Sequence, residues 1–97
     1  MRLKEEEVWE KLNNIKLYPI EPEVLEKIYS LDYSIQLRES IAENLVLLDT
    51  EGWKKIKNLL DKYGLQLELI YASGLCDDQG AKSWLLNHIK INKKFNL

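Results

Sequence analysis

Two stretches of the chain repeat one another with the apolar spacing of helices. Residues 25–45 read LEKIYSLDYSIQLRESIAENL, and residues 53–75 read WKKIKNLLDKYGLQLELIYASGL. Matching residues lie 28 positions apart in the first part and 30 in the second: Lys27/Lys55, Ile28/Ile56, Leu31/Leu59, Gln36/Gln66, Leu37/Leu67, Ala42/Ala72 and Leu45/Leu75. A period near 30 residues with helical spacing is typical of stacked helical hairpins. The sequence therefore predicts an all-α fold, a small α-solenoid.

The composition fits one helical domain over residues 1–97. A chain of 97 residues has room for a single core. Its hydrophobic share of 45% is enough to fill that core, and four glycines and two prolines favour helices with short loops over a fold rich in tight turns. No apolar run approaches the roughly 20 residues of a membrane span, and the charged start lacks a secretory signal. We therefore expect a soluble, cytoplasmic protein with no membrane partner.

The charge is uneven along the chain. Residues 1–51 hold 12 acidic and 6 basic side chains, whereas residues 52–97 hold 4 acidic and 8 basic ones, so the two halves differ in sign although the net charge is only −2. Such a small net charge does not by itself attract nucleic acid. The halves are either solvated helix faces of opposite sign or a polarised molecule that orients a partner.

Apolar spacing predicts about six helices, stacked as antiparallel hairpins. The leading helix spans about 4–14, the first repeat 22–48, the second repeat 50–76 and the trailing helix 79–91. N-caps are expected at Asp32 or Ser34, at Asp49 or Thr50, and at Asp77 or Asp78. Gly64 is expected to end the fourth helix in the left-handed conformation.

The segment 65–71, LQLELIY, also alternates like a strand. A strand here would have no partner elsewhere in the chain, and the segment matches the helical copy before it, so we favour a helix. Its inner face should repeat that of the third helix. We expect Leu67, Tyr71, Ala72 and Leu75 to point inward, as Leu37, Ala42 and Leu45 do.

The first copy carries a recognisable pattern. An Asp in the turn is followed by an aliphatic–Arg pair, then a small residue, then Leu: Asp32, Leu37-Arg38, Ile41-Ala42 and Leu45. The sequence resembles the short bacterial HEAT-like repeats known from phycobilisome lyase-type proteins, over about residues 22–91. The second copy keeps Asp61, Leu67, Tyr71-Ala72 and Leu75, but has Glu68 in place of the Arg. Armadillo-like and variant leucine-rich repeats remain open alternatives.

The resemblance implies a protein-binding scaffold. A few members of the HEAT-like class are chromophore lyases or chaperones, so an accessory subunit of a lyase-type protein is an alternative. Neither the resemblance nor the residues implies a cofactor.

The sequence offers little for catalysis or metal binding. Cys76 and His88 are single residues of their types, and neither stands in a catalytic or metal-binding motif. We expect Cys76 to be a small buried residue and His88 to be structural or exposed, and we do not expect an enzyme. Lys54, Lys55, Lys57 and Lys62 give one helix a basic face, but no complete helix-turn-helix pattern accompanies it, so nucleic-acid binding is not favoured.

The residues that differ between the copies predict an interaction surface. Its candidate residues are Arg38, Glu39 and Glu43 in the first copy, Glu68, Leu69 and Ser73 in the second, and Trp9 in the leading helix. Leu69 stands where the first copy has Glu39, so we expect it to be an exposed apolar contact. The predicted function is a non-catalytic module that binds another protein. Self-association through the terminal helices and a small nucleic-acid-binding protein are the alternatives.

Overall fold

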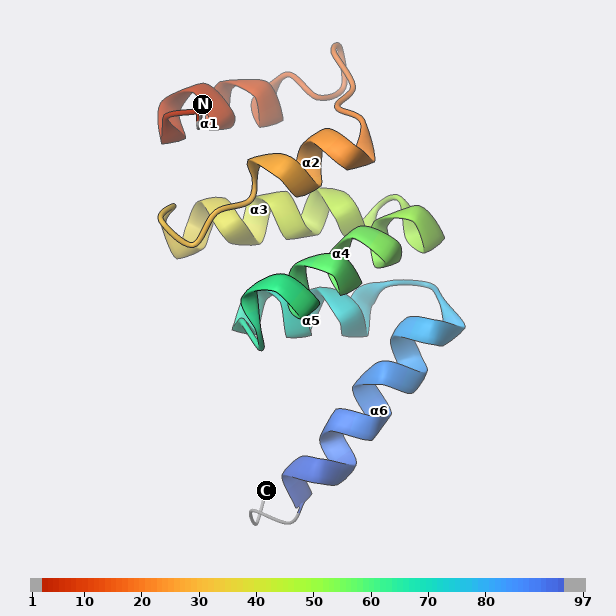
Figure 1. The fold of residues 1–97 in the computed structure, drawn as a ribbon. Helices are drawn as coiled ribbons and strands as arrows, with labels where there is room; N and C mark the ends of the chain where they lie inside the picture. Colours follow the sequence, from red (N-terminus) through yellow and green to blue (C-terminus); the bar gives the residue numbers. More distant parts are fainter. Residues whose placement is uncertain (1–2, 94–97) are drawn as a thin grey trace.

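The computed structural model describes residues 3–93, and this part of the chain contains six α-helices and no strand (Figure 1). The helices are α1 (Glu5–Asn13), α2 (Pro22–Ile28), α3 (Ile35–Val46), α4 (Asp49–Tyr63), α5 (Leu67–Leu75) and α6 (Gln79–Lys93). The expected all-α fold is confirmed. The segment that could have been a strand lies at the start of α5. None of the described helices is both long and apolar enough to cross a membrane.

The helices form two rows. Successive helices run in opposite directions, α3 lies between α1 and α5, and α2 lies beside α4 (Figure 1). The α3 helix also contacts α4 and α2 of the other row. The α6 helix leaves the rows at an angle and packs mainly against α5. This places α3 and α5 next to one another and parallel, which matters for the surface described below.

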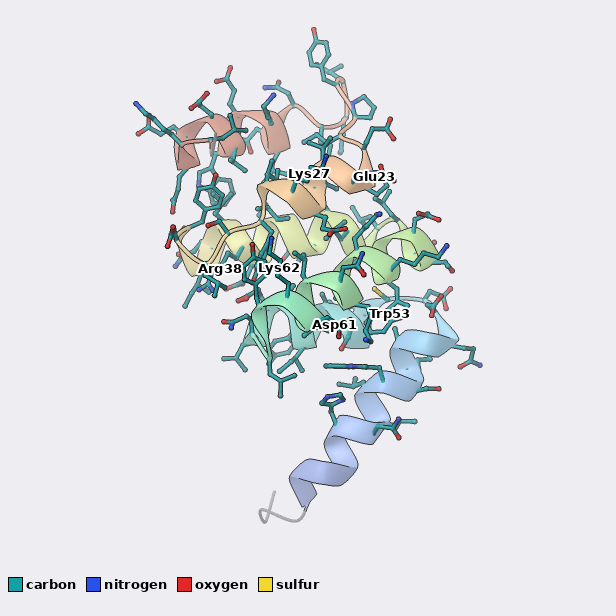
Figure 2. All side chains as sticks on the ribbon, viewed as in Figure 1. Glu23, Lys27, Arg38, Trp53, Asp61 and Lys62 are labelled. Carbon is teal, nitrogen blue, oxygen red and sulfur yellow. The ribbon has the colours of Figure 1, made fainter. Side chains whose placement is uncertain are left out.

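Aromatic rings attach α6 to the rest of the molecule. The ring of Trp84 in α6 lies 6.0 Å from that of Trp53 in α4 and stacks on that of His88 at 3.8 Å. Figure 2 labels Trp53 where α4 faces α6. Both tryptophans serve the core: Trp53 is buried, and Trp84 is partly buried and packs against the core cluster.

The helix ends follow local chemistry in most places. The Ser34 hydroxyl accepts a hydrogen bond from the backbone of Leu37 (3.3 Å), and the Asp78 carboxylate accepts one from the backbone of Ala81 (3.2 Å). Gly64 ends α4 with a φ of 84°, a conformation that a side chain would disfavour. The start of α4 differs from expectation, because the N-cap is Leu48, which forms no side-chain cap.

Burial repeats every 31 residues in both parts, rather than at the separations of 28 and 30 predicted from matching residues. Every buried position of α3 is followed 31 residues later by a buried position in or at the end of α5: Leu37/Glu68, Ile41/Ala72, Ala42/Ser73 and Leu45/Cys76. The same separation relates buried or half-buried positions of α2 and α4: Leu25/Ile56, Ile28/Leu59 and Tyr29/Leu60.

The expected inner face of α5 is therefore wrong. Leu67, Tyr71 and Leu75 are 74%, 74% and 65% exposed, and only Ala72 points inward as predicted. The reason is geometric, because a shift of one residue turns a helical position by about 100° about the axis. Leu31 is also exposed although Leu59 is buried, because α2 ends at Ile28.

Gly52 is required where α3 meets α4. A Cβ atom there would lie 1.6 Å from the carbonyl oxygen of Leu45 and 2.6 Å from its carbonyl carbon. Both atoms belong to the backbone, so no side-chain rotation relieves the contact. The closeness follows from the short connection, since only two residues separate α3 from α4.

We predict that Gly52→Ala lowers the free energy of unfolding by about 3 kcal/mol or more, because the α3–α4 corner must open. Urea unfolding followed by circular dichroism measures this loss. The matched control is Gly74→Ala in α5, where a new Cβ would meet only the flexible end of Leu85 at 3.1 Å, so a change within about 1 kcal/mol is expected. Equal stability of the two variants would contradict the close approach.

Candidate interaction surface

The structure separates the seven residues predicted for the interaction surface. Glu39 and Glu43 are exposed on α3 as expected, and Trp9 is half-buried on α1. Leu69 is fully buried, Ser73 is fully buried and Glu68 is 7% exposed, so the expectation that these three are surface contacts is wrong. The one-residue shift in α5 moves them onto the inner face. Only 12% of the Arg38 side chain is exposed, because it turns toward Glu68.

A groove of about 390 Å³ runs between α3 and α5. Its α3 edge carries Ile35, Glu39 and Glu43, and its α5 edge carries residues that are likewise spaced by four: Leu67, Tyr71 and Leu75. Residues at this spacing lie along one side of a helix. Buried Ala42 and Ala72 also line the groove, and their small side chains leave the space between the two edges open.

The groove is apolar with one acidic edge. Ile35, Leu67, Tyr71 and Leu75 are each more than half exposed. Of the ten residues that line the groove, three are glutamates and none is basic. Glu68 is paired with Arg38 in the interior, whereas Glu39 and Glu43 remain at the surface. The groove therefore presents exposed apolar side chains beside two negative charges.

A larger hollow of about 630 Å³ lies where α1 meets the connector to α2. Exposed Tyr18 and Val24 line it together with five polar or charged residues: Glu7, Glu10, Lys11, Asn14 and Glu21. One wall is an irregular connector, so this hollow lacks the two regular helix edges of the α3–α5 groove.

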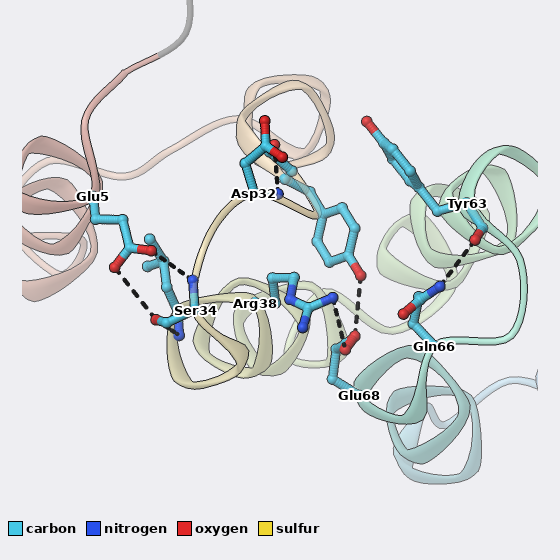
Figure 3. A network of polar contacts seen from close by, with 10 residues as sticks. Glu5, Asp32, Ser34, Arg38, Tyr63, Gln66 and Glu68 are labelled. Atoms are coloured by element: carbon cyan, nitrogen blue, oxygen red, sulfur yellow. Dashed lines mark hydrogen bonds and ion pairs between the residues drawn. The ribbon is translucent and has the colours of Figure 1, made fainter.

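A buried polar cluster joins α2, α3 and α5 (Figure 3), and one of its members, Glu68, also lines the groove. The Tyr29 hydroxyl donates a hydrogen bond of 3.0 Å to Oε2 of Glu68, and Nη1 of Arg38 lies 3.8 Å from Oε1 of the same carboxylate. These residues come from α5, α3 and the end of α2. Glu68 occupies the place of Leu37, a core position, so its charge needs both partners.

The cluster changes the acidity of Tyr29. Burial raises the pKa of the Tyr29 hydroxyl well above its ordinary value, and the negative charge and hydrogen bond of Glu68 raise it further. The nearby Arg38 guanidinium opposes this only in part. Tyr29 thus stays a neutral donor to Glu68. Its ring also packs against that of Tyr63, with ring centroids 5.3 Å apart.

Cys76 and His88 form no reactive site. Cys76 is 1% exposed, as expected, and burial raises the pKa of its thiol to about 11, so the thiol is protonated at neutral pH and a poor nucleophile. Nδ1 of His88 lies 2.9 Å from the carbonyl oxygen of Trp84. Within the described residues, no group of three potential ligands could hold a metal ion.

Three of the four lysines on the basic face of α4 lie near carboxylates of the chain itself, and the fourth, Lys62, lies over the ring of Tyr63. Lys55 lies 3.7 Å from Glu23 and 3.8 Å from Glu26 of α2, and these two ion pairs join α4 to α2. Lys54 pairs with Glu51, and Lys57 with Asp61 at 2.9 Å. Each carboxylate offsets a positive charge that a phosphate backbone would otherwise attract. This local neutralisation weakens the argument for nucleic-acid binding.

The sequence comparisons do not identify this chain. No family model, no curated protein and no solved structure matches it.

The groove residues Ile35, Leu67, Tyr71 and Leu75 were missed by the sequence prediction of the surface. A signal was present in the composition of residues 65–75, which are apolar on nearly every side of a helix. A helix in a two-row stack cannot bury all its faces, so one apolar face must stay open. The spacing of four places Leu67, Tyr71 and Leu75 on one face, but by itself it does not distinguish an open face from a buried one.

We predict that Glu68→Gln lowers the free energy of unfolding by about 2–3 kcal/mol, because it leaves the Arg38 charge largely buried without its counter-ion. The triple variant Tyr29→Phe, Arg38→Leu, Glu68→Leu should recover most of that loss. Urea unfolding tests both.

The control for the Glu68 variants is Lys57→Ala, which breaks the exposed ion pair between Lys57 and Asp61. This ion pair is shorter than that of Arg38 and Glu68, at 2.9 Å, but its loss should lower the free energy of unfolding by less than about 1 kcal/mol. If Glu68→Gln costs no more than Lys57→Ala, the buried cluster does not stabilise the fold.

We predict that Tyr29 stays protonated in the folded protein as the pH is raised to the onset of alkaline unfolding. Because its pKa is raised in the folded state, the stability it contributes is complete below about pH 10 and is lost as the pH rises above that value. Phenolate absorbance before alkaline unfolding should therefore be unchanged by Tyr29→Phe. A lower phenolate absorbance in this variant than in the wild type would contradict the raised pKa.

Proposed function

We propose that the chain is a non-catalytic protein-interaction module whose binding surface is the α3–α5 groove. The observation that carries this proposal is the row of Leu67, Tyr71 and Leu75, each at least 65% exposed on one helix edge. Contiguous exposed apolar side chains mark surfaces that other molecules cover. Burying one such side chain contributes up to about 1.5–3 kcal/mol, from which the costs of association are subtracted.

The two-row packing supports the helical-repeat part of this proposal. The chain behaves like a short HEAT-like array, in which neighbouring helices of one row provide the groove. The rigid elements below it hold the edges in place: Gly52 fixes the corner between α3 and α4, and Glu68 ties α5 to α3. A preorganised groove loses little entropy when a partner binds.

A photoreactive residue at the groove tests the proposal. Replacement of Tyr71 with p-benzoylphenylalanine should produce a crosslink to a discrete protein in extract of the cells that make this chain. The same residue in place of Lys54, exposed on α4, is the control and should not yield that product. Leu67→Glu combined with the probe at position 71 should abolish the crosslink, while circular dichroism stays unchanged. Absence of a crosslink that is specific to position 71 would sink the proposed function.

A further inference from the structure

We propose that the occupant of the α3–α5 groove is an amphipathic helix of a partner protein with basic residues along one flank of its apolar stripe. This inference rests on the proposed function and adds the chemistry of the partner.

The shape of the groove fits a short helix. Its two edges are parallel helices with side chains repeated every four residues, and small Ala42 and Ala72 lie between them. Residues 67 and 75 are eight positions apart, which corresponds to about 12 Å along α5. That length covers a little more than two turns of a helix laid against it. Helix-in-groove recognition uses anchors at such spacings on the partner.

The charge of the groove selects the partner. Glu39 and Glu43 lie one turn apart on the α3 edge, and the single charged residue that α5 contributes to the groove, Glu68, is buried and paired with Arg38. Within the described residues, neither glutamate takes part in an ion pair. Two Lys or Arg residues one turn apart on one flank of a docked helix would face them. An acidic helix would meet like charges at the same places.

A second copy of this chain suits the groove less well. Two copies placed groove to groove would bring glutamates toward glutamates or toward the apolar α5 edge of the other copy. Lys54, Lys55 and Lys57 of α4 lie in the other row and are engaged by Glu51, by Glu23 and Glu26, and by Asp61. Lys62 of the same helix lies over the ring of Tyr63. These lysines therefore do not supply the complementary charge without giving up existing contacts.

A displayed library of 18-residue helical peptides is the direct test. One stripe varies among Leu, Ile, Phe and Met, and both flanks vary among Lys, Glu and Gln. Selection on the wild-type chain should enrich Lys on one flank. Selection on Glu39→Lys/Glu43→Lys should enrich Glu there instead. For the best peptide, fluorescence anisotropy should give about tenfold tighter binding to wild type than to the double variant, and added salt should reduce the difference.

The matched control is Glu6→Lys/Glu10→Lys, which changes the same charge at the same spacing on exposed positions of α1. It should bind the selected peptide like the wild type. A peptide set without flank preference, or an equal effect of both double variants, overturns the inference and leaves the proposed function standing.

The remaining outcomes distinguish a failure of this inference from a failure of the proposed function. If no peptide is enriched while the probe at position 71 still crosslinks a protein, the occupant is not such a helix. If neither experiment gives binding, the proposed function fails as well. A dimer in light scattering that Tyr71→Glu dissociates would make a second copy the occupant and overturn the inference.

Discussion

The buried carboxylate of Glu68 determines how α5 sits against the rest of the fold. It takes a core position that leucine holds in α3, and a charge there is tolerated only if donors reach it. Tyr29 and Arg38 supply them from the end of α2 and from α3. With Glu68 turned inward, Leu67 and Tyr71 must turn outward on the neighbouring side of the helix. The interior polar contact and the exposed apolar edge are thus two results of one rotation.

The sequence predicts local features of the fold better than it predicts how the helices are rotated against one another. Helix number, the Gly64 terminus and the Ser34 and Asp78 caps follow from local patterns, and the structure has them. The rotation of α5 about its axis does not follow from local patterns. Identical residues such as Gln36/Gln66 and Leu37/Leu67 lie 30 positions apart, whereas buried positions repeat every 31. Identity favours pairing leucine with leucine. Only the Tyr29 and Arg38 contacts make Glu68 an acceptable counterpart of Leu37.

The acidic residues of the first half of the sequence fall into two groups: some form ion pairs with lysines of the second half, and others remain unpaired at the groove within the described part of the chain. Lysines from the basic half neutralise carboxylates of the acidic half, as Lys55 does with Glu23 and Glu26, and these pairs lie along the α2–α4 row. Surface pairs of this kind contribute little stability each, but they leave that row nearly neutral. Glu39 and Glu43 lie on the other row, where no basic residue lines the groove. The excess of acidic residues in the first half of the sequence therefore leaves a negative edge at Glu39 and Glu43 on α3, which no other described residue neutralises.

That negative edge also accounts for how an open apolar groove can persist. Exposed Leu67, Tyr71 and Leu75 would otherwise favour association with any similar surface, including the same groove on another copy. Two grooves that approach each other with their α3 edges bring their glutamates together, and this repulsion opposes self-association, whereas the proposed basic helix would meet opposite charges. Removing the charges with Glu39→Gln/Glu43→Gln would keep the apolar contacts and remove the discrimination. In the proposed interaction, the glutamates therefore act mainly on which partner binds, and the apolar edge on how tightly.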